Sequence, residues 1–170
     1  MWCVVHVRDK KEKNMEDFVA NLLPQGLAAR CFHLRRVRRK KFEGQWQTVH
    51  EDLFPGYVFI DTNQPDSVYK ELKRVPRPKL LFSDDEYVSV LERKETQFME
   101  TIADRNGVIG ISIVKIAEDG TIRYMSGPLV NVKDQIEKVD LHKRVAKLET
   151  SILGQKRILY LGIEIDGRQM

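Results

Sequence analysis

The sequence predicts an α+β fold: an N-terminal α/β sandwich of antiparallel sheet and helices, followed by a small all-β barrel. In the first 105 or so residues, strand-length apolar runs alternate with segments whose apolar residues recur at helical spacing. After Asn106-Gly107 the chain holds short strand-like runs between turn signals, with no convincing helical pattern. The first part is therefore predicted to read β-α-β-β-β-α-(β)-α.

The first element expected is a strand at residues 2–7, which is rich in β-branched and aromatic residues. Asn14 has the features of a helix N-cap, and apolar residues follow it at helical spacing until residues 23–26, Leu-Pro-Gln-Gly, end the helix. Residues 29–37 are expected to form the next strand. Residues 42–46, with a central Glu-Gly, are typical of a β-hairpin turn.

The sequence Phe-Pro-Gly precedes an apolar strand at residues 57–60. Pro65 begins a second helix, which the prolines of residues 75–78 end. Residues 83–86, Ser-Asp-Asp-Glu, form a capping box that is expected to open a third helix. Its apolar face is expected to consist of Val88, Leu91, Phe98, Met99 and Ile102.

The barrel strands are expected at residues 111–116, 121–125, 139–147 and 157–165. Turn signals separate them, and Asn106-Gly107 is the natural hinge before them. We therefore expect one domain at residues 1–105, a short linker at 106–110 and a second domain at 111–170.

The charge is unevenly distributed. The net charge is only +4, but residues 28–41 hold seven basic residues and no acid. Such a run is often only a solvated face; its main alternative is a site for a polyanion, since cations that meet phosphates release counterions.

Several classes of protein are excluded or disfavoured. No apolar run approaches the length of a membrane span, and the apolar N-terminus is too short for a signal peptide, so we expect a cytoplasmic monomer. No phosphate loop, nucleophile elbow or metal-ligand spacing is present, so we expect neither an enzyme nor a cofactor or metal. A disulfide between Cys3 and Cys31 is geometrically possible, but free thiols are favoured in a cytosolic chain.

A family resemblance becomes visible in two places. Trp2 at the start of the first strand and Phe-Pro-Gly-Tyr-Val-Phe-Ile at residues 54–60 resemble the N-terminal (NGN) domain of NusG proteins. The Gly-Pro-Leu of residues 127–129, the His-Lys-Arg-x-Ala of 142–146 and the Leu-Gly-x-Glu of 161–164 are similar to the KOW domain that follows it. This second set is most similar to the LoaP subgroup of NusG paralogues, which are antitermination factors.

The sequence departs from general NusG proteins at two places. Leu129-Val130-Asn131 and Gln135 replace a glycine-rich pattern, and residues 75–83 lack the usual glycine-valine-phenylalanine stretch. Both departures suit a specialised paralogue better than a housekeeping factor.

The resemblance implies an NGN domain that binds the clamp helices of the largest catalytic subunit of RNA polymerase, which requires an apolar groove. Phe32, Phe54 and Tyr57 are the candidate groove residues, with Phe59 beside them; the alternative is that they belong to the core. Phosphates of upstream or non-template DNA, or of RNA, are expected to contact the basic hairpin. Its candidate residues are Arg35, Arg36, Arg38, Arg39, Lys40 and Lys41.

The resemblance to LoaP also implies recognition of a nascent leader RNA hairpin by the KOW domain. The candidate RNA-binding residues are Lys133, Lys138, His142, Lys143, Arg144, Lys147 and Arg157. Trp46 either stacks on a base or packs across the hairpin strands. Three alternatives stay open: a general NusG-like elongation factor, a KOW-type RNA-binding or ribosome-associated protein, and a KOW domain that binds a protein.

Overall fold

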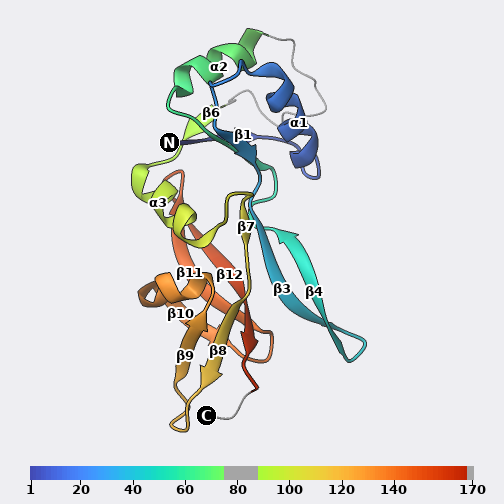
Figure 1. Ribbon diagram of the computed structural model, residues 1–170, viewed down its shortest axis with the longest axis vertical. Helices are drawn as coiled ribbons and strands as arrows, with labels where there is room; N and C mark the ends of the chain where they lie inside the picture. The colour runs from blue at the N-terminus through green and yellow to red at the C-terminus, as the bar shows by residue number, and fades with distance from the viewer. Residues whose placement is uncertain (75–87, 168–170) are drawn as a thin grey trace. The chain divides into compact units, whose positions relative to one another are not determined.

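The computed structural model describes residues 1–74 and 88–167 of the chain. It is an α+β structure with mainly antiparallel sheets and few helices, as the sequence predicts (Figure 1). Contacts divide the chain into two compact units. The first consists of Met1–Leu34 and Phe54–Thr96, and the second of Arg35–Leu53 and Gln97–Met170.

The first unit is built on a four-stranded antiparallel sheet with the strand order β2-β5-β1-β6. One sheet face packs on two helices, because alternate residues such as Val5 and Val58 meet Met15 of α1 and Leu72 of α2 in a single apolar cluster. The elements are β1 (Trp2–His6), α1 (Glu12–Leu22), β2 (Arg30–Phe32), β5 (Tyr57–Asp61), α2 (Pro65–Arg74) and β6 (Val88–Val90).

The other face of this sheet is aromatic. The Trp2 ring meets Phe32 edge-on with 4.9 Å between centroids, and Phe32 stacks on Phe59 at 5.8 Å. Such pairs contribute about 0.5–1.5 kcal/mol beyond the burial of their area. The strand that begins at Trp2 and the apolar strand after Phe-Pro-Gly were both predicted from the sequence, and they pair with each other in this sheet.

The second unit contains a three-stranded and a five-stranded sheet, with orders β4-β3-β7 and β10-β11-β12-β8-β9. The first comprises β3 (Arg35–Phe42), β4 (Gln45–Asp52) and β7 (Val108–Ile109). The second comprises β8 (Ser112–Ile116), β9 (Ile122–Ser126), β10 (Ile136–Asp140), β11 (Val145–Ile152) and β12 (Gln155–Ile165). Two short 3₁₀ turns, η1 (Pro128–Asn131) and η2 (Lys133–Gln135), connect β9 to β10, and helix α3 (Arg93–Ile102) crosses the division between the units.

The β3–β4 hairpin has the predicted two-residue turn. Glu43 and Gly44 both have positive φ angles, 48° and 82°, and Phe42 pairs directly with Gln45. Glycine adopts this backbone conformation at no steric cost, which is why Glu-Gly at this place predicts the hairpin.

Four predicted elements differ from the structure, and tertiary contacts account for the first two. Helix α1 begins at Glu12, so Asn14 lies inside the helix and Lys11 precedes it without a side-chain cap. The buried Glu12 carboxylate instead accepts a 2.8 Å hydrogen bond from the Gly56 N–H. This contact ties the first residue of the helix to the turn at Gly56.

The third helix begins later than predicted. Val88 lies in strand β6, opposite Val5 of β1, so it is not part of the helix. Helix α3 begins at Arg93, where the Glu95 side chain accepts a 3.0 Å hydrogen bond from the Glu92 N–H. The predicted capping box at residues 83–86 lies outside the described residues.

Residues 139–147 do not form one strand. The chain turns at residues 141–144, between β10 and β11. The Asp140 carboxylate accepts a 2.9 Å hydrogen bond from the Lys143 N–H, and Arg144 has a φ angle of 57°. These two local features reverse the chain and place Asp140 opposite Val145. Similarly, residues 29–37 are interrupted between β2 and β3.

The two cysteines lie on opposite sides of strand β5, because Cys3 of β1 and Cys31 of β2 both pair with Ile60. Both thiols are free. Two inter-strand spacings amount to about 10 Å, which is too far for a disulfide. Burial raises the pKa of Cys3 to about 11 and that of Cys31 to about 12, so both thiols stay protonated at neutral pH.

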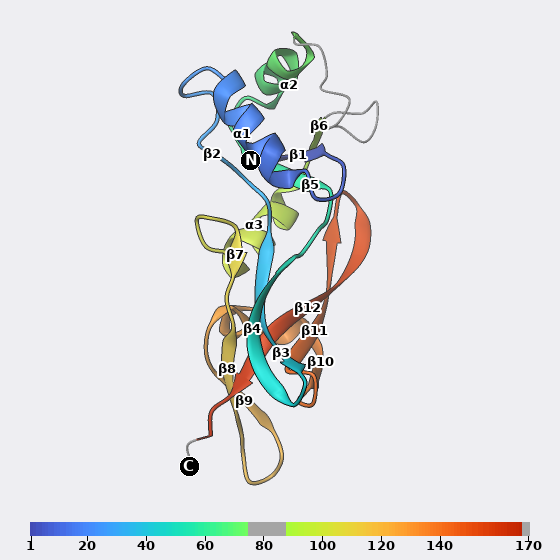
Figure 2. The ribbon, with the colours of Figure 1, turned by 90° about the vertical axis from the view of Figure 1, so that its right-hand side faces the viewer.

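Strand β3 lies against β12 at Gly162 (Figure 2). A methyl group at Gly162 would overlap with the Val37 carbonyl oxygen and lie 2.8 Å from the Arg38 Cα. The two backbones can approach this closely only because residue 162 has no side chain.

We therefore expect Gly162→Ala to destabilise the second unit. The added methyl group would force β3 away from β12, and overpacking of this kind costs about 1–3 kcal/mol. The urea midpoint, followed by circular dichroism, should fall. Gly110→Ala is the matched control, because open space surrounds Gly110. The urea midpoint of this variant should not change. Equal midpoints for the two variants would show that β3 does not press on β12 in solution.

Candidate nucleic-acid interface

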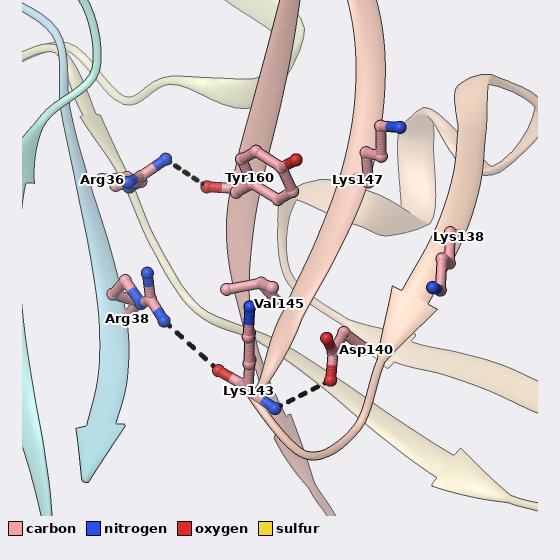
Figure 3. Close-up of a pocket in the computed structure, with 8 residues that line it drawn as sticks. All are labelled: Arg36, Arg38, Lys138, Asp140, Lys143, Val145, Lys147 and Tyr160. Carbon is pink, nitrogen blue, oxygen red and sulfur yellow. Dashed lines mark hydrogen bonds between the residues drawn. The ribbon is translucent and has the colours of Figure 1, made fainter.

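A basic pocket of about 510 Å³ lies within the second unit. Five cations, one acid, one aromatic residue and one aliphatic residue line it (Figure 3). They are Arg36 and Arg38 of β3, Lys138 and Asp140 of β10, Lys143 of the following turn, Val145 and Lys147 of β11, and Tyr160 of β12. We call this the basic pocket.

The strand register places these side chains on one face of the five-stranded sheet. Lys138 pairs with Lys147, and Lys147 pairs with Tyr160, so the three form one row across β10, β11 and β12. The next row on the same face consists of Asp140, Val145 and Gly162. The face that carries the pocket is thus set by pairing between residues far apart in the sequence.

Arg36 and Arg38 of the β3–β4 hairpin form hydrogen bonds with the edge of this sheet region. The Arg36 guanidinium donates a 2.8 Å hydrogen bond to the Tyr160 carbonyl oxygen, and Arg38 donates a longer one of 3.4 Å to the Lys143 carbonyl oxygen (Figure 3). A guanidinium has five N–H donors. Arg36 also donates a 3.1 Å hydrogen bond from Nε to the Glu51 carboxylate, and each arginine still keeps donors for a ligand.

Acidic side chains partly neutralise the pocket. Glu51 of β4 lies 3.1 Å from Arg36, 3.7 Å from Arg38 and 3.9 Å from Lys40. Lys147 lies 3.6 Å from Glu137. Because these pairs are partly exposed, each contributes less than about 1 kcal/mol and can be exchanged for a phosphate.

The hydrogen bond from the Lys143 N–H lowers the pKa of Asp140 below its ordinary value. The folded pKa thus lies below the unfolded one. The hydrogen bond to the Asp140 carboxylate therefore stabilises the folded state at neutral pH. This stabilisation is lost as the pH falls through the pKa of Asp140 in the folded state.

Arg144 does not line the basic pocket. Its guanidinium lies over the ring of Trp46 in β4, with 5.2 Å between Cζ and the ring centroid, and Lys41 lies 5.8 Å from the same ring. The backbone carbonyl oxygen of Arg144 accepts a 3.0 Å hydrogen bond from the Ile163 N–H. In this structure Trp46 packs within the second unit, and a nucleic-acid base would have to compete with Arg144 for the ring.

The other candidate residues are spread over the second unit. Lys133 lies on η2, His142 in the β10–β11 turn and Arg157 on β12, all outside the residues that line the pocket. On the hairpin, Arg35, Arg39 and Lys41 share the strand face opposite to that of Arg36, Arg38 and Lys40. The structure thus brings together two hairpin arginines and three of the candidate lysines.

Asp140, Val145 and Tyr160 line the pocket but were not predicted from the sequence, and Tyr160 is the aromatic residue among them. It is 42% exposed although it is aromatic. The available signal was the alternation of β12, in which Leu159, Leu161 and Ile163 form a buried face and Tyr160 falls on the other. That signal does not reveal that Lys147 is its neighbour, since the register between β11 and β12 sets that.

In the first unit, the candidate polymerase-binding residues differ in exposure. Phe32 and Phe54 are buried, at 4% and 7% exposed, and Phe59 is fully buried. Tyr57 is half-buried; it stacks on Phe54 at 6.0 Å and meets His6 edge-on at 4.8 Å. Of these four aromatic side chains, Tyr57 offers the most surface to a partner.

A family model described as transcription termination factor nusG matches residues 1–100, which is more than half of the chain. The chain belongs to the NusG family. It is therefore a NusG-type transcription termination or antitermination factor.

Two further NusG proteins are similar to this member of the family. The transcription termination/antitermination protein NusG of Helicobacter pylori strain J99 is 25% identical over 122 residues, which cover 69% of this chain and 68% of that protein. A solved structure on domain interaction in Thermotoga maritima NusG is 17% identical, with a TM-score of 0.45, and the match covers 95% of this chain and 92% of that one.

The described residues of this NusG family member hold neither a group of side chains suited to a metal ion nor a helix long and apolar enough to cross a membrane. The family match covers the strand at Trp2, the Phe-Pro-Gly turn and the basic hairpin. The lysines of the basic pocket lie beyond it, in residues 138–147.

We expect Glu51→Gln to strengthen binding of single-stranded RNA at low salt by up to about fivefold, because it releases Arg36 and Arg38 from a competing carboxylate. Fluorescence anisotropy would measure the change. Glu43→Gln is the matched control, since it removes the same charge from the exposed hairpin turn. If both variants gained equally, only net charge would matter, and the local pairing at Glu51 would have no role.

Proposed function

We propose that this chain is an operon-specific antitermination factor of the LoaP type, which acts in the cytoplasm. It binds RNA polymerase through its N-terminal domain and a nascent leader RNA hairpin with a contribution from its KOW domain. The bound factor promotes read-through of terminators. The observation that carries this proposal is the basic pocket, in which five cations from β3, β10, β11 and one turn share one site.

The proposed domains are residues 1–105 (NGN), a linker at 106–110 and residues 111–170 (KOW). Within the linker, Val108 and Ile109 form β7 and pair with Arg35 and Arg36 of β3. The Asp104 side chain also accepts hydrogen bonds from the N–H groups of Asn106 and Val108.

The polymerase contact proposed for the first domain uses Tyr57, with Phe54 and Phe32 supporting it. Phe54 stacks under the Tyr57 ring, and the Glu12–Gly56 hydrogen bond fixes the turn that precedes it. A tyrosine held by packing loses little conformational entropy on binding, which favours it as an anchor for a helical partner such as the clamp helices. No chemical step is required, because holding the clamp closed favours elongation over pausing.

The RNA contact is proposed for the lysines and arginines of the second domain, chiefly Lys143 and Arg144, with the surrounding cations. The hairpin residues from Arg35 to Lys41 would contact phosphates of RNA or of upstream or non-template DNA. Electrostatic contacts of this kind place a nucleic acid without reading its sequence. Specificity for one leader hairpin therefore has to come from its shape or from unpaired bases.

Two alternatives compete with this proposal. A general NusG-like elongation factor would use the same polymerase contact without a leader hairpin. A KOW-type ribosome-associated protein would use the basic pocket without polymerase. Five cations dominate the lining of the basic pocket, which suits the binding of a polyanion.

The first test is transcription through a terminator on templates with and without the leader hairpin. We expect the factor to raise read-through only when the hairpin is present, and Lys138→Gln with Lys147→Gln to abolish the gain because two phosphate contacts are lost. Equal stimulation of both templates would favour the general elongation factor instead.

A second test concerns the polymerase contact. We expect Tyr57→Ala to weaken co-purification with RNA polymerase about 10-fold or more, since a central aromatic anchor typically contributes over 1 kcal/mol. Tyr57→Phe should retain most of the binding. Tyr69→Ala on α2 is the control, because Tyr69 is also half-buried in the first unit but lies outside the proposed contact. Undiminished binding by folded Tyr57→Ala would place the contact elsewhere.

A further inference from the structure

We propose that the basic pocket binds one unpaired nucleotide, with its base stacked on the ring of Tyr160 and its phosphates held by Lys147 and Arg36. The inference rests on the proposed RNA-binding function and makes it more specific. It assigns the site to a looped-out or single-stranded residue of the RNA, rather than to the side of a duplex.

The position of Tyr160 supports a stacking role. Its ring lies on the same sheet face as Lys147 and Lys138, in the row that crosses three strands. Figure 3 draws the ring between Arg36 on one side and Lys147 on the other. Among the residues that the structure describes, no other aromatic ring stacks on Tyr160, although Phe54 and Tyr57 stack in the first unit.

The backbone of Tyr160 is held on both sides. Its strand pairs with β11 on one side, and its carbonyl oxygen accepts the hydrogen bond from Arg36 on the other. Tyr160 is 42% exposed, whereas its neighbours Leu159 and Leu161 form the buried face of β12. An exposed aromatic ring on a fixed backbone, beside several cations, is an arrangement used to bind single-stranded nucleic acid.

Cations lie on several sides of the ring (Figure 3). Lys147 and Lys138 lie along the row away from the ring, Lys143 lies at the turn end of the pocket, and Arg36 and Arg38 lie on β3. The pocket therefore surrounds a single aromatic platform with positive charge on three sides. A base on the ring would direct its 5′ and 3′ phosphates toward these side chains.

A paired base would not fit this arrangement. In a duplex each base face is covered by its stacked neighbour, so no face is free for Tyr160. Duplex RNA is instead bound through its backbone and minor groove, over surfaces longer than one pocket. An unpaired base exposes a whole face, and it allows sequence-specific contacts as well as charge.

The test compares two RNA probes with the full chain. One is a fluorescein-labelled oligoadenylate of about 12 nucleotides, a length within the site sizes of single-strand-binding domains. The other is a fully paired RNA duplex of the same length. Tyr160→Ala should weaken oligoadenylate binding about 5- to 150-fold, as the loss of one base stack does, and leave duplex binding unchanged.

Three controls separate stacking from charge and from misfolding. Tyr160→Phe should bind oligoadenylate like the unaltered chain, because the ring is kept. Met125→Ala removes an equally exposed apolar side chain from β9, outside the pocket, and should have no effect. Lys147→Gln should weaken both probes and lower the slope of log affinity against log salt for the single strand by about 0.7.

Each outcome decides between the two proposals. Selective loss of oligoadenylate binding in Tyr160→Ala supports the stacking site. If Tyr160→Ala binds both probes normally while Lys147→Gln weakens both, RNA binding stands and the stacking site is overturned. An equal loss of binding to both probes in Tyr160→Ala also overturns the stacking site. If the unaltered chain binds neither probe nor a leader hairpin, the proposed RNA-binding function itself fails.

Discussion

The basic pocket depends on one close approach, that of strand β3 to strand β12 at Gly162. A side chain at this position would hold the two backbones apart, and Arg36 would then no longer reach the Tyr160 carbonyl oxygen. Without that contact the hairpin arginines and the sheet lysines would form two separate charged surfaces. A residue with no side chain therefore decides how the charged residues are grouped, which composition alone does not show.

Bringing five cations together has an electrostatic cost that the structure offsets with carboxylates. Glu51 forms ion pairs with Arg36, Arg38 and Lys40, and Glu137 forms one with Lys147. These pairs are partly exposed, so they hold the side chains in place without the desolvation penalty of buried ions. A polyanion can therefore replace each carboxylate at small cost, and the affinity will depend strongly on salt. The site is organised before any ligand arrives.

Local signals predicted a large part of the fold. The Glu43-Gly44 turn and the strand after Phe-Pro-Gly were predicted correctly because backbone geometry or a long apolar run specifies them. One kind of error arose where a local turn was read as strand, and the other where a distant contact overrides local preference. Asp140 and Arg144 turn the chain inside an apparent strand, and Val88 pairs with Val5 instead of entering a helix. Likewise, charge patterning indicated the lysines of the pocket, but only the strand register reveals Tyr160 beside Lys147.

The pairing of Arg36 with Tyr160 has a consequence for synthesis on the ribosome. The two residues are 124 positions apart, so the hairpin emerges long before the strand that receives it. At bacterial and eukaryotic translation rates this interval is roughly 6 to 25 s. During that time the nascent hairpin presents an unbalanced run of arginine and lysine close to ribosomal RNA. Glu51, translated within a second or a few seconds of Arg36, is then a counter-ion on the same hairpin that can limit a premature attachment.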